Sequence, residues 1–248
     1  MSFNQLQIRF QTARSLPAPY AYFYTLRLKP LGGNGVQVDL AITYPDRDDI
    51  DDDELIAEGY TRDDDFQWAG QLPKPWLQAI DELVAKTAVE PLNEDGLDED
   101  DEFWEIALES KPLGLRKGQP ANSDSWQYLT QELIQAAYEA IGRERPFELI
   151  YLDTSAKQGE LELHLVASFA DRTVRVTTVQ NRHEQTRTLP WATLQQTMAE
   201  VYNHDYDPDE ALQKRPRRDG QWLNLGSEEW YNITEFPALS RLFQKLSR

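Results

Sequence analysis

The stretch FELIYLDTSAKQGELELHLVASFADR, residues 147–172, decides the fold, because it has the pattern of two strands joined by a turn. A second stretch with the same layout, YFYTLRLKPLGGNGVQVDLAITYPDR, occupies residues 22–47. At a spacing of 125 residues the two stretches match, pairing Val36 with Leu161, Val38 with Leu163, Leu40 with Leu165, Tyr44 with Phe169, Asp46 with Asp171 and Arg47 with Arg172. This register predicts an internally duplicated unit, although strand–turn–strand patterns also recur by convergence.

Two later blocks extend the repeat. A Leu-Pro dipeptide precedes a tryptophan at 72–76 and again at 189–191. The segment 102–106 (EFWEI) is similar to 229–233 (EWYNI), at a spacing of 127 residues. A nearly constant spacing over three separate blocks favours a repeat of more than a hundred residues over a solenoid of short ones.

The predicted fold class is α+β, with antiparallel β-meanders and helices packed on the sheet. Alternating apolar residues predict strands, as at 36–42, and apolar residues at helical spacing predict helices at 72–87, 125–142 and 237–246, with another after Trp191. Residues 45–54 have the pattern of a solvated loop or a helix start, and residues 54–70 that of one or two further strands with a turn at 61–65. Residues 183–187 fit a turn or a short extension of a strand. We expect two related α+β units, residues 1–115 and 120–248, or one pseudo-symmetric body, with the Gly- and Pro-bearing segment 111–124 as the boundary.

Charge excludes some functions. The 248 residues carry a net charge of -18, and most of the excess lies before residue 121. Nucleic-acid binding needs a basic face, so we expect no nucleic-acid partner. We also expect no membrane, because no apolar run approaches the length of a span and an acidic chain is repelled by anionic lipid. With no cysteine and no signal-peptide pattern, a cytoplasmic location is the default expectation.

Motifs for catalysis and metal binding are scarce. The three histidines lie at spacings that bring no two of them together. The segment 203–211 spaces Asp205, Asp207 and Asp209 as an EF-hand loop begins, but Glu210 stands where glycine is needed and Pro216 where glutamate is needed. The GGNG segment lacks the Lys-Ser/Thr of a phosphate loop and fits a hairpin turn. We therefore expect no cofactor and assign no catalytic or metal residues.

Two charged clusters and several aromatics stay open to more than one interpretation. The basic cluster KRPRR, residues 214–218, fits a solvated loop, an intramolecular partner for the acidic first half, or a site for phosphate or an acidic partner. Acidic runs are usually solvated loops, but they also fit a basic partner. Trp104, Trp222 and Trp230 lie near acidic loops and short strands, where contact with a partner is possible.

These patterns favour a non-enzymatic, acidic protein-binding module that uses the loops 46–65 and 93–102 against a basic protein partner. An immunity-type inhibitor of a basic toxin, such as a nuclease, would have this composition. The predicted binding residues are Asp48, Asp49, Asp51, Asp52, Asp53, Glu54, Asp63, Asp64, Asp65 and Trp104. The alternative is a hydrolase or transferase with a scattered carboxylate or metal site, since paired carboxylates can lie far apart in sequence.

Overall fold

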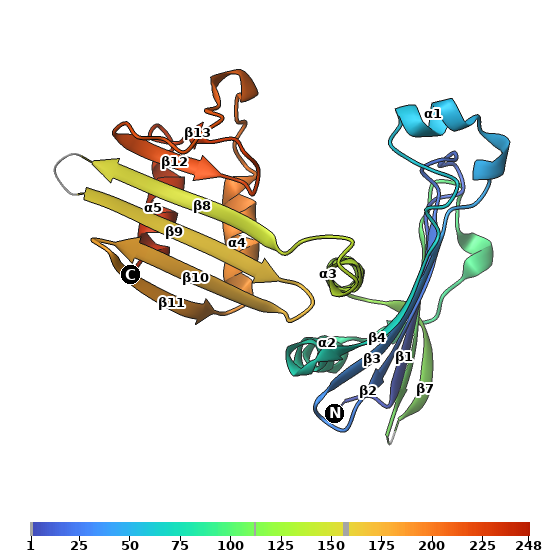
Figure 1. The fold of residues 1–248 in the computed structure, drawn as a ribbon. Helices are drawn as coiled ribbons and strands as arrows, with labels where there is room; N and C mark the ends of the chain where they lie inside the picture. Colours follow the sequence, from blue (N-terminus) through green and yellow to red (C-terminus); the bar gives the residue numbers. More distant parts are fainter. Residues whose placement is uncertain (1, 112, 156–158) are drawn as a thin grey trace. The chain divides into compact units, whose positions relative to one another are not determined.

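The structure is a computed structural model that describes residues 2–111, 113–155 and 159–248. It is α+β, as predicted, with antiparallel sheets of seven and six strands (Figure 1). The chain forms two compact units, Met1–Tyr138 and Glu139–Arg248. Each unit has its own sheet and its own helices, and each is described by itself.

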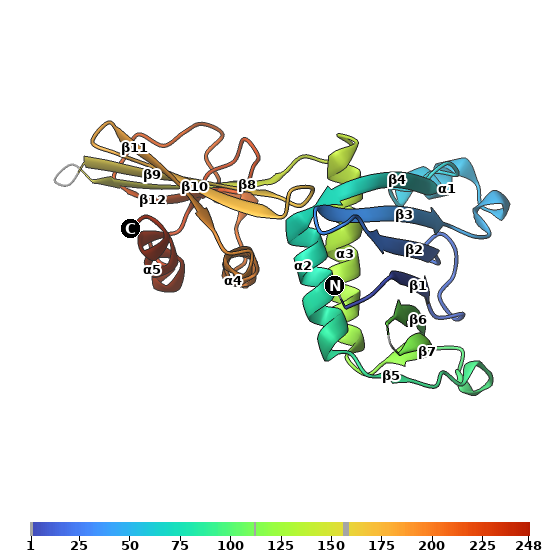
Figure 2. The ribbon, with the colours of Figure 1, turned by 90° about the horizontal axis from the view of Figure 1, so that it is seen from below.

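Unit 1 is a seven-stranded antiparallel sheet with the strand order β4-β3-β2-β1-β6-β7-β5. Its elements are β1 (Gln5–Gln11), β2 (Phe23–Pro30), β3 (Gly35–Thr43), η1 (Arg47–Asp49), α1 (Asp52–Ala57), β4 (Phe66–Pro73), α2 (Lys74–Lys86), β5 (Val89–Glu90), η2 (Glu94–Gly96), β6 (Phe103–Ser110), β7 (Gly114–Pro120) and α3 (Ser123–Ala140). Helices α2 and α3 cover one face of the sheet (Figure 2).

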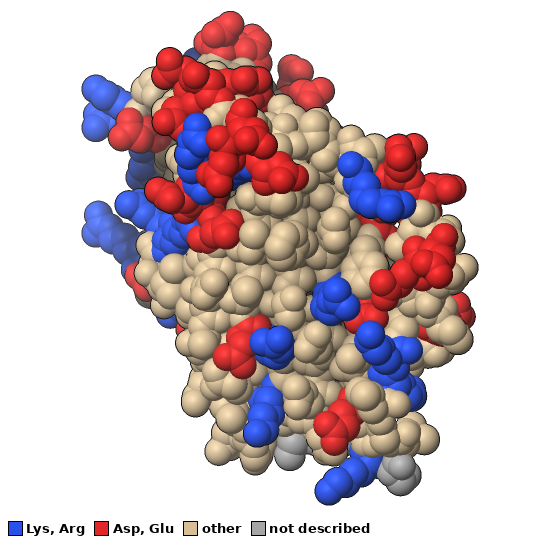
Figure 3. All heavy atoms as spheres, turned by 90° about the vertical axis from the view of Figure 1, so that its right-hand side faces the viewer, with Lys and Arg blue, Asp and Glu red and all other residues tan. Residues whose placement is uncertain are grey.

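The core of unit 1 lies between that face and the two helices. Leu6 and Ile8 of β1 are fully buried, and so are Trp76 of α2 and Trp126 of α3. The alternate residues of the strands face the opposite side, which none of the described helices of unit 1 covers. Figure 3 shows that side: its middle is largely uncharged, and acidic side chains gather at its upper edge, around α1.

Unit 2 is a six-stranded antiparallel sheet with the order β11-β10-β9-β8-β12-β13. Its elements are β8 (Phe147–Ser155), β9 (Gly159–Ser168), β10 (Thr173–Gln180), β11 (His183–Leu189), α4 (Ala192–Val201), η3 (Pro208–Glu210), β12 (Gly220–Asn224), β13 (Tyr231–Asn232) and α5 (Pro237–Leu246). Helices α4 and α5 lie on one face (Figure 2), where Tyr151 stacks on Phe243. On the other face Leu152, Trp222 and Trp230 form a second buried cluster with Leu212 of the α4–β12 connection.

The two sheets share a strand order. Each has a four-stranded meander followed by a helix, further strands beyond the first strand of the meander, three in unit 1 and two in unit 2, and a final helix. By position in the sheet, β3 corresponds to β10. The sequence register instead pairs β3 with β9, because it aligns Val36 with Leu161. The Leu-Pro matches do fall in corresponding places, since both end a fourth strand and precede a helix. The shared order is an observation about topology, and duplication is not confirmed by it.

Three segments differ from the sequence-based prediction. Residues 54–57, predicted to start a strand, belong to α1, and the helix start allowed for the acidic run is the one that forms, because Asp51 caps the helix by accepting a hydrogen bond from the Asp53 amide. The segment 111–124, predicted as a boundary, contains β7, which pairs with β6 inside the first sheet. Residues 183–187, predicted as a turn or short extension, belong to the full-length edge strand β11.

Candidate functional site

The acidic loops lie together at one end of the unit 1 sheet. The connections 12–22, 44–65 and 91–102 all leave the sheet at this end, because the strand residues that flank them are register neighbours: Gln11 pairs with Phe23 and Phe103, Phe23 with Thr43, and Ile42 with Phe66. We call residues 46–65 and 93–102 the acidic cap. The cap holds 18 of the 43 acidic residues of the chain and two basic ones, Arg47 and Arg62. Antiparallel topology thus joins two acidic loops that are distant in sequence.

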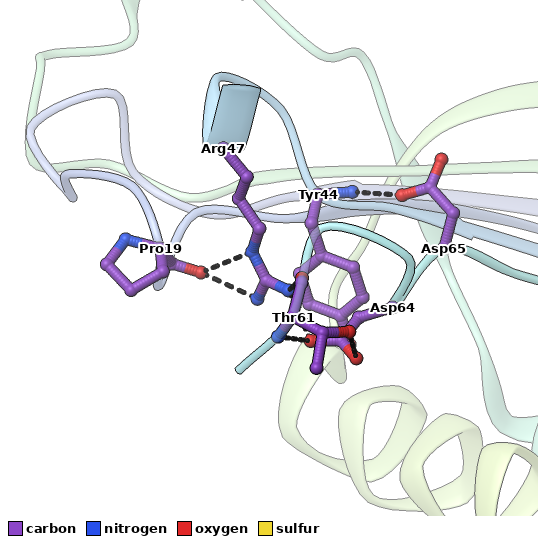
Figure 4. Close-up of polar contacts among 6 residues, drawn as sticks. All are labelled: Pro19, Tyr44, Arg47, Thr61, Asp64 and Asp65. Atoms are coloured by element: carbon purple, nitrogen blue, oxygen red, sulfur yellow. Dashed lines mark hydrogen bonds and ion pairs between the residues drawn. The ribbon is translucent and has the colours of Figure 1, made fainter. Parts of the chain in front are cut away.

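Arg47 holds the first loop in place (Figure 4). Its side chain is 2% exposed. The guanidinium donates from Nε and one terminal nitrogen to the Pro19 carbonyl, at 3.2 and 2.8 Å, and from the other nitrogen to the Thr61 carbonyl at 2.9 Å. That second nitrogen also donates to the Asp64 carboxylate. One buried cation therefore connects the start and the end of the loop to the 12–22 connection.

The surroundings of Arg47 compensate for its burial. The guanidinium carbon lies 4.0 Å from the centre of the Tyr44 ring and 4.7 Å from that of Tyr60, so two π-faces contact the cation. Burial alone would raise the pKa of Asp64. Hydrogen bonds from the Thr61 amide and hydroxyl, together with Arg47, outweigh burial and lower this pKa below its ordinary value. Asp64 is therefore a structural carboxylate.

A second arginine ties the outer part of the loop together. Arg62 donates to the carbonyls of Asp48 and Ile50, at 2.7 and 2.6 Å, and pairs with the Asp52 carboxylate. Leu55 anchors helix α1 to the protein, because its side chain is buried and only 1% exposed. The acidic residues of the first loop thus stand on a short, ordered helix with fixed ends, in contrast to a freely moving chain.

The 12–22 connection contacts both acidic loops. Arg14 donates to the Leu97 carbonyl and the Ser15 amide donates to the Glu99 carbonyl, both at 2.9 Å. On the other side, Tyr20 donates from its hydroxyl to Glu58 at 2.9 Å, in addition to the Arg47–Pro19 contact. Both acidic loops are therefore hydrogen-bonded to one shared segment, and this fixes the separation between them.

Most predicted binding residues are exposed on this cap. Eight of the nine predicted carboxylates are exposed: Asp48, Asp49, Asp51, Asp52, Asp53, Glu54, Asp63 and Asp65. The exception is Asp64, which is partly buried and forms an ion pair with Arg47. Trp104 is 5% exposed, so its predicted place on the binding surface is wrong. Its ring packs edge-on against Phe10, with centroids 5.4 Å apart, because it belongs to the inward face of β6.

Apolar side chains that the sequence did not single out also reach the cap surface. Ile56 on α1 is 65% exposed, Tyr20 is 41% exposed and Leu16 is 38% exposed. Tyr20 and Leu16 lie on the segment that joins the two loops. Their signal in sequence was weak, because an isolated apolar residue between polar ones fits a core or a surface position equally well.

The basic cluster and the other two tryptophans considered for partner contact lie in unit 2. Arg215 of the basic cluster pairs with Glu160 and Glu162 of β9, and Arg218 lies over the ring of Trp222, 4.8 Å from its centre. Trp222 and Trp230 are buried, so the predicted possibility of surface contact is wrong for both. Among the described residues, no three His, Asp or Glu side chains are grouped closely enough to hold a metal ion.

The chain matches no protein-family model, no curated protein and no solved structure. Within the part of the chain that the structure describes, none of the helices combines the length and hydropathy that crossing a membrane requires.

Proposed function

We propose that this protein is a non-enzymatic binding protein whose acidic cap docks on a basic surface of a protein partner. The observation that carries the proposal is that both acidic loops are hydrogen-bonded to the 12–22 connection, which holds them side by side. An immunity-type inhibitor of a basic toxin is the more specific form of the same proposal. The alternative, a hydrolase or transferase with a scattered carboxylate or metal site, stays a prediction from sequence.

Electrostatics supports the proposal. Crowding 18 carboxylates against two cations at one end of a unit is unfavourable for the isolated chain, because like charges repel. A basic partner relieves that repulsion, and the field of the cap accelerates encounter with such a partner. Exposed charges that serve solubility alone work equally well when dispersed over the surface.

The construction of the cap supports it further. Arg47 and Arg62 hold the first loop in one conformation, and backbone hydrogen bonds hold the second. A preorganised surface loses less conformational entropy on binding than a mobile acidic tail does. Apolar contact area next to the charges is added by Ile56, Tyr20 and Leu16. Protein–protein interfaces commonly combine a few such apolar contacts with surrounding polar residues.

Partner capture tests this proposal. The full chain is immobilised and exposed to extracts of its native cells at low and at high ionic strength. We expect the retained protein to be basic and to be released as salt screens the charges. Retention of neutral or acidic proteins, unaffected by salt, would contradict the proposal.

A further inference from the structure

A small pocket in unit 2 combines aromatic walls with an acidic rim. It lies between the α4–β12 connection and the segment from β13 to the start of α5, and has a volume of about 130 Å³. By volume it would hold about four water molecules. Its lining includes three aromatic and three acidic residues beside Asn232: Tyr206, Tyr231, Phe236, Asp205, Asp207 and Glu210.

The rings meet at angles. The Tyr206 and Tyr231 centroids are 5.1 Å apart with the planes inclined at 47°, and those of Tyr206 and Phe236 are 6.3 Å apart with the planes at 80°. Rings that stacked flat would cover one another's faces. Here the rings are inclined and all three residues line the pocket. The electron-rich face of an aromatic ring attracts a cation.

The tyrosine hydroxyls are engaged elsewhere. Tyr206 donates to the Val201 carbonyl at 2.7 Å, and Tyr231 donates to the Glu229 carboxylate. Burial raises the pKa of Tyr206 to about 12, and hydrogen bonding to Glu229 raises the pKa of Tyr231. Both residues are therefore neutral phenols near neutral pH.

The carboxylates of the rim have few partners. Asp207 caps η3 by accepting a hydrogen bond from the Asp209 amide at 2.9 Å. Asp205 and Glu210 are exposed, and neither side chain forms a hydrogen bond or ion pair with the described residues. The rim is not a metal cage either, because no three acidic or histidine side chains of the described residues are grouped for one.

We propose that this pocket binds an alkylammonium group, either the head of a lysine side chain or a quaternary ammonium ion. A compact cation of this kind fits the volume, contacts the ring faces, and is neutralised by the free carboxylates of the rim. A bare metal ion would lack converging ligands, and a neutral alkyl group would leave the acidic rim uncompensated. The pocket lies in the other unit from the acidic cap, so the two proposals stand or fall separately.

Calorimetric titration of the full chain with choline tests the proposal. The matched control is the neutral isostere of choline, in which a tert-butyl group replaces trimethylammonium. We expect choline to bind and the isostere to bind at least about tenfold more weakly, since it lacks the cation–π attraction. Equal binding of both compounds, or no binding of choline, overturns the proposal.

Variants locate the binding. Tyr231→Leu removes an aromatic wall and should weaken choline binding by about 3- to 10-fold. Tyr231→Phe keeps the ring and should bind choline as the unmodified protein does. Thermal unfolding checks that both variants fold. If Tyr231→Leu folds and binds choline unchanged, or if Tyr231→Phe weakens binding as much, the pocket is not the site.

Two further titrants distinguish a lysine side chain from a quaternary ammonium ion as the ligand. They are lysine amide acetylated on its α-nitrogen, which keeps the charged ε-ammonium group, and the same compound trimethylated on its ε-nitrogen. Tighter binding of the plain lysine derivative supports a lysine side chain of a protein. Tighter binding of the trimethylated derivative, matched by choline, supports a quaternary ammonium group. Failure of both to compete with choline overturns the assignment of the pocket to an alkylammonium head.

Discussion

Arg47→Met removes the cation that organises the first acidic loop while keeping an apolar stem of similar length. The wild-type guanidinium donates to the carbonyls of Pro19 and Thr61 and to the Asp64 carboxylate. In the variant both carbonyls lose this donor and the carboxylate loses its cation. The loop should then open from the body of unit 1 far more often than in the unmodified protein.

The magnitude follows from these contacts. The hydrogen bonds to three acceptor groups contribute about 1 kcal/mol each, and the two ring faces add about 1 kcal/mol together. Water can reach Asp64, which is 22% exposed, and this recovers part of the loss. We expect the free energy of opening the 44–65 segment to fall by about 3 kcal/mol, which corresponds to a change of about a hundredfold in the opening equilibrium.

Amide hydrogen exchange is the assay. The amides of Leu55 and Tyr60, which donate to the carbonyls of Asp51 and Leu55, report the opening of the loop. Arg47→Met should accelerate their exchange by up to about a hundredfold. The comparison variant is Arg62→Met, which removes the hydrogen bonds to the Asp48 and Ile50 carbonyls and an ion pair of the same loop. Because these contacts are exposed and water can replace them, this variant should accelerate exchange clearly less than Arg47→Met does. Similar acceleration in both variants, or almost none in Arg47→Met, would refute the assignment of Arg47 as the anchor.

Two further predictions concern unit 1. The pKa of Asp64 is lowered in the folded state, so its contribution to stability is present above the ordinary carboxyl pKa and is lost as pH falls through the folded value. The protection of the 44–65 amides, measured relative to the intrinsic exchange rate at each pH, should therefore fall below about pH 4, and Asp64→Asn should flatten that fall, whereas an unchanged pH profile in the variant would count against it. Gly118 has a φ of +155°, and an added Cβ would lie 1.9 Å from the Glu90 carbonyl oxygen, so Gly118→Ala should destabilise the β5–β7 pair and cost about 2–4 kcal/mol in chemical denaturation, with Gly114→Ala, in open space, costing clearly less; equal costs would be the contrary result.

Local periodicity was sufficient for much of the fold. The strands with one apolar face and the long helices follow from spacings of two and of three to four residues, which do not depend on distant parts of the chain. The same periodicity explains the shifted register of the predicted repeat. A strand alternation looks alike in β9 and β10, so aligning β3 with either strand keeps apolar residues on apolar positions.

Fewer features of the candidate site could be predicted from such patterns. Trp104 could have been assigned to the core, because Ile106 and Leu108 follow it at a spacing of two and face the same way. Helix α1 carries a readable signal in Asp51 and the acidic residues after it, which favour a helix N-terminus. Arg47 has no comparable signal, since its burial depends on a carbonyl 28 residues earlier and on rings brought together by the tertiary fold.

Charge reversal on the cap tests the central claim most directly. Asp49, Asp53 and Glu54 are exposed and their side chains form no hydrogen bond or ion pair with the described residues, so their replacement by lysine leaves the anchoring contacts in place. The control reverses three exposed acidic residues of unit 2, namely Asp171, Glu184 and Glu228.

The measurement is the association rate of each triple variant with the basic partner captured from native cells. The proposal predicts that reversal on the cap slows association by about tenfold or more at low ionic strength, that salt narrows the difference, and that the unit 2 control has a much smaller effect. Equal association rates for the cap variant and the unit 2 control would contradict it.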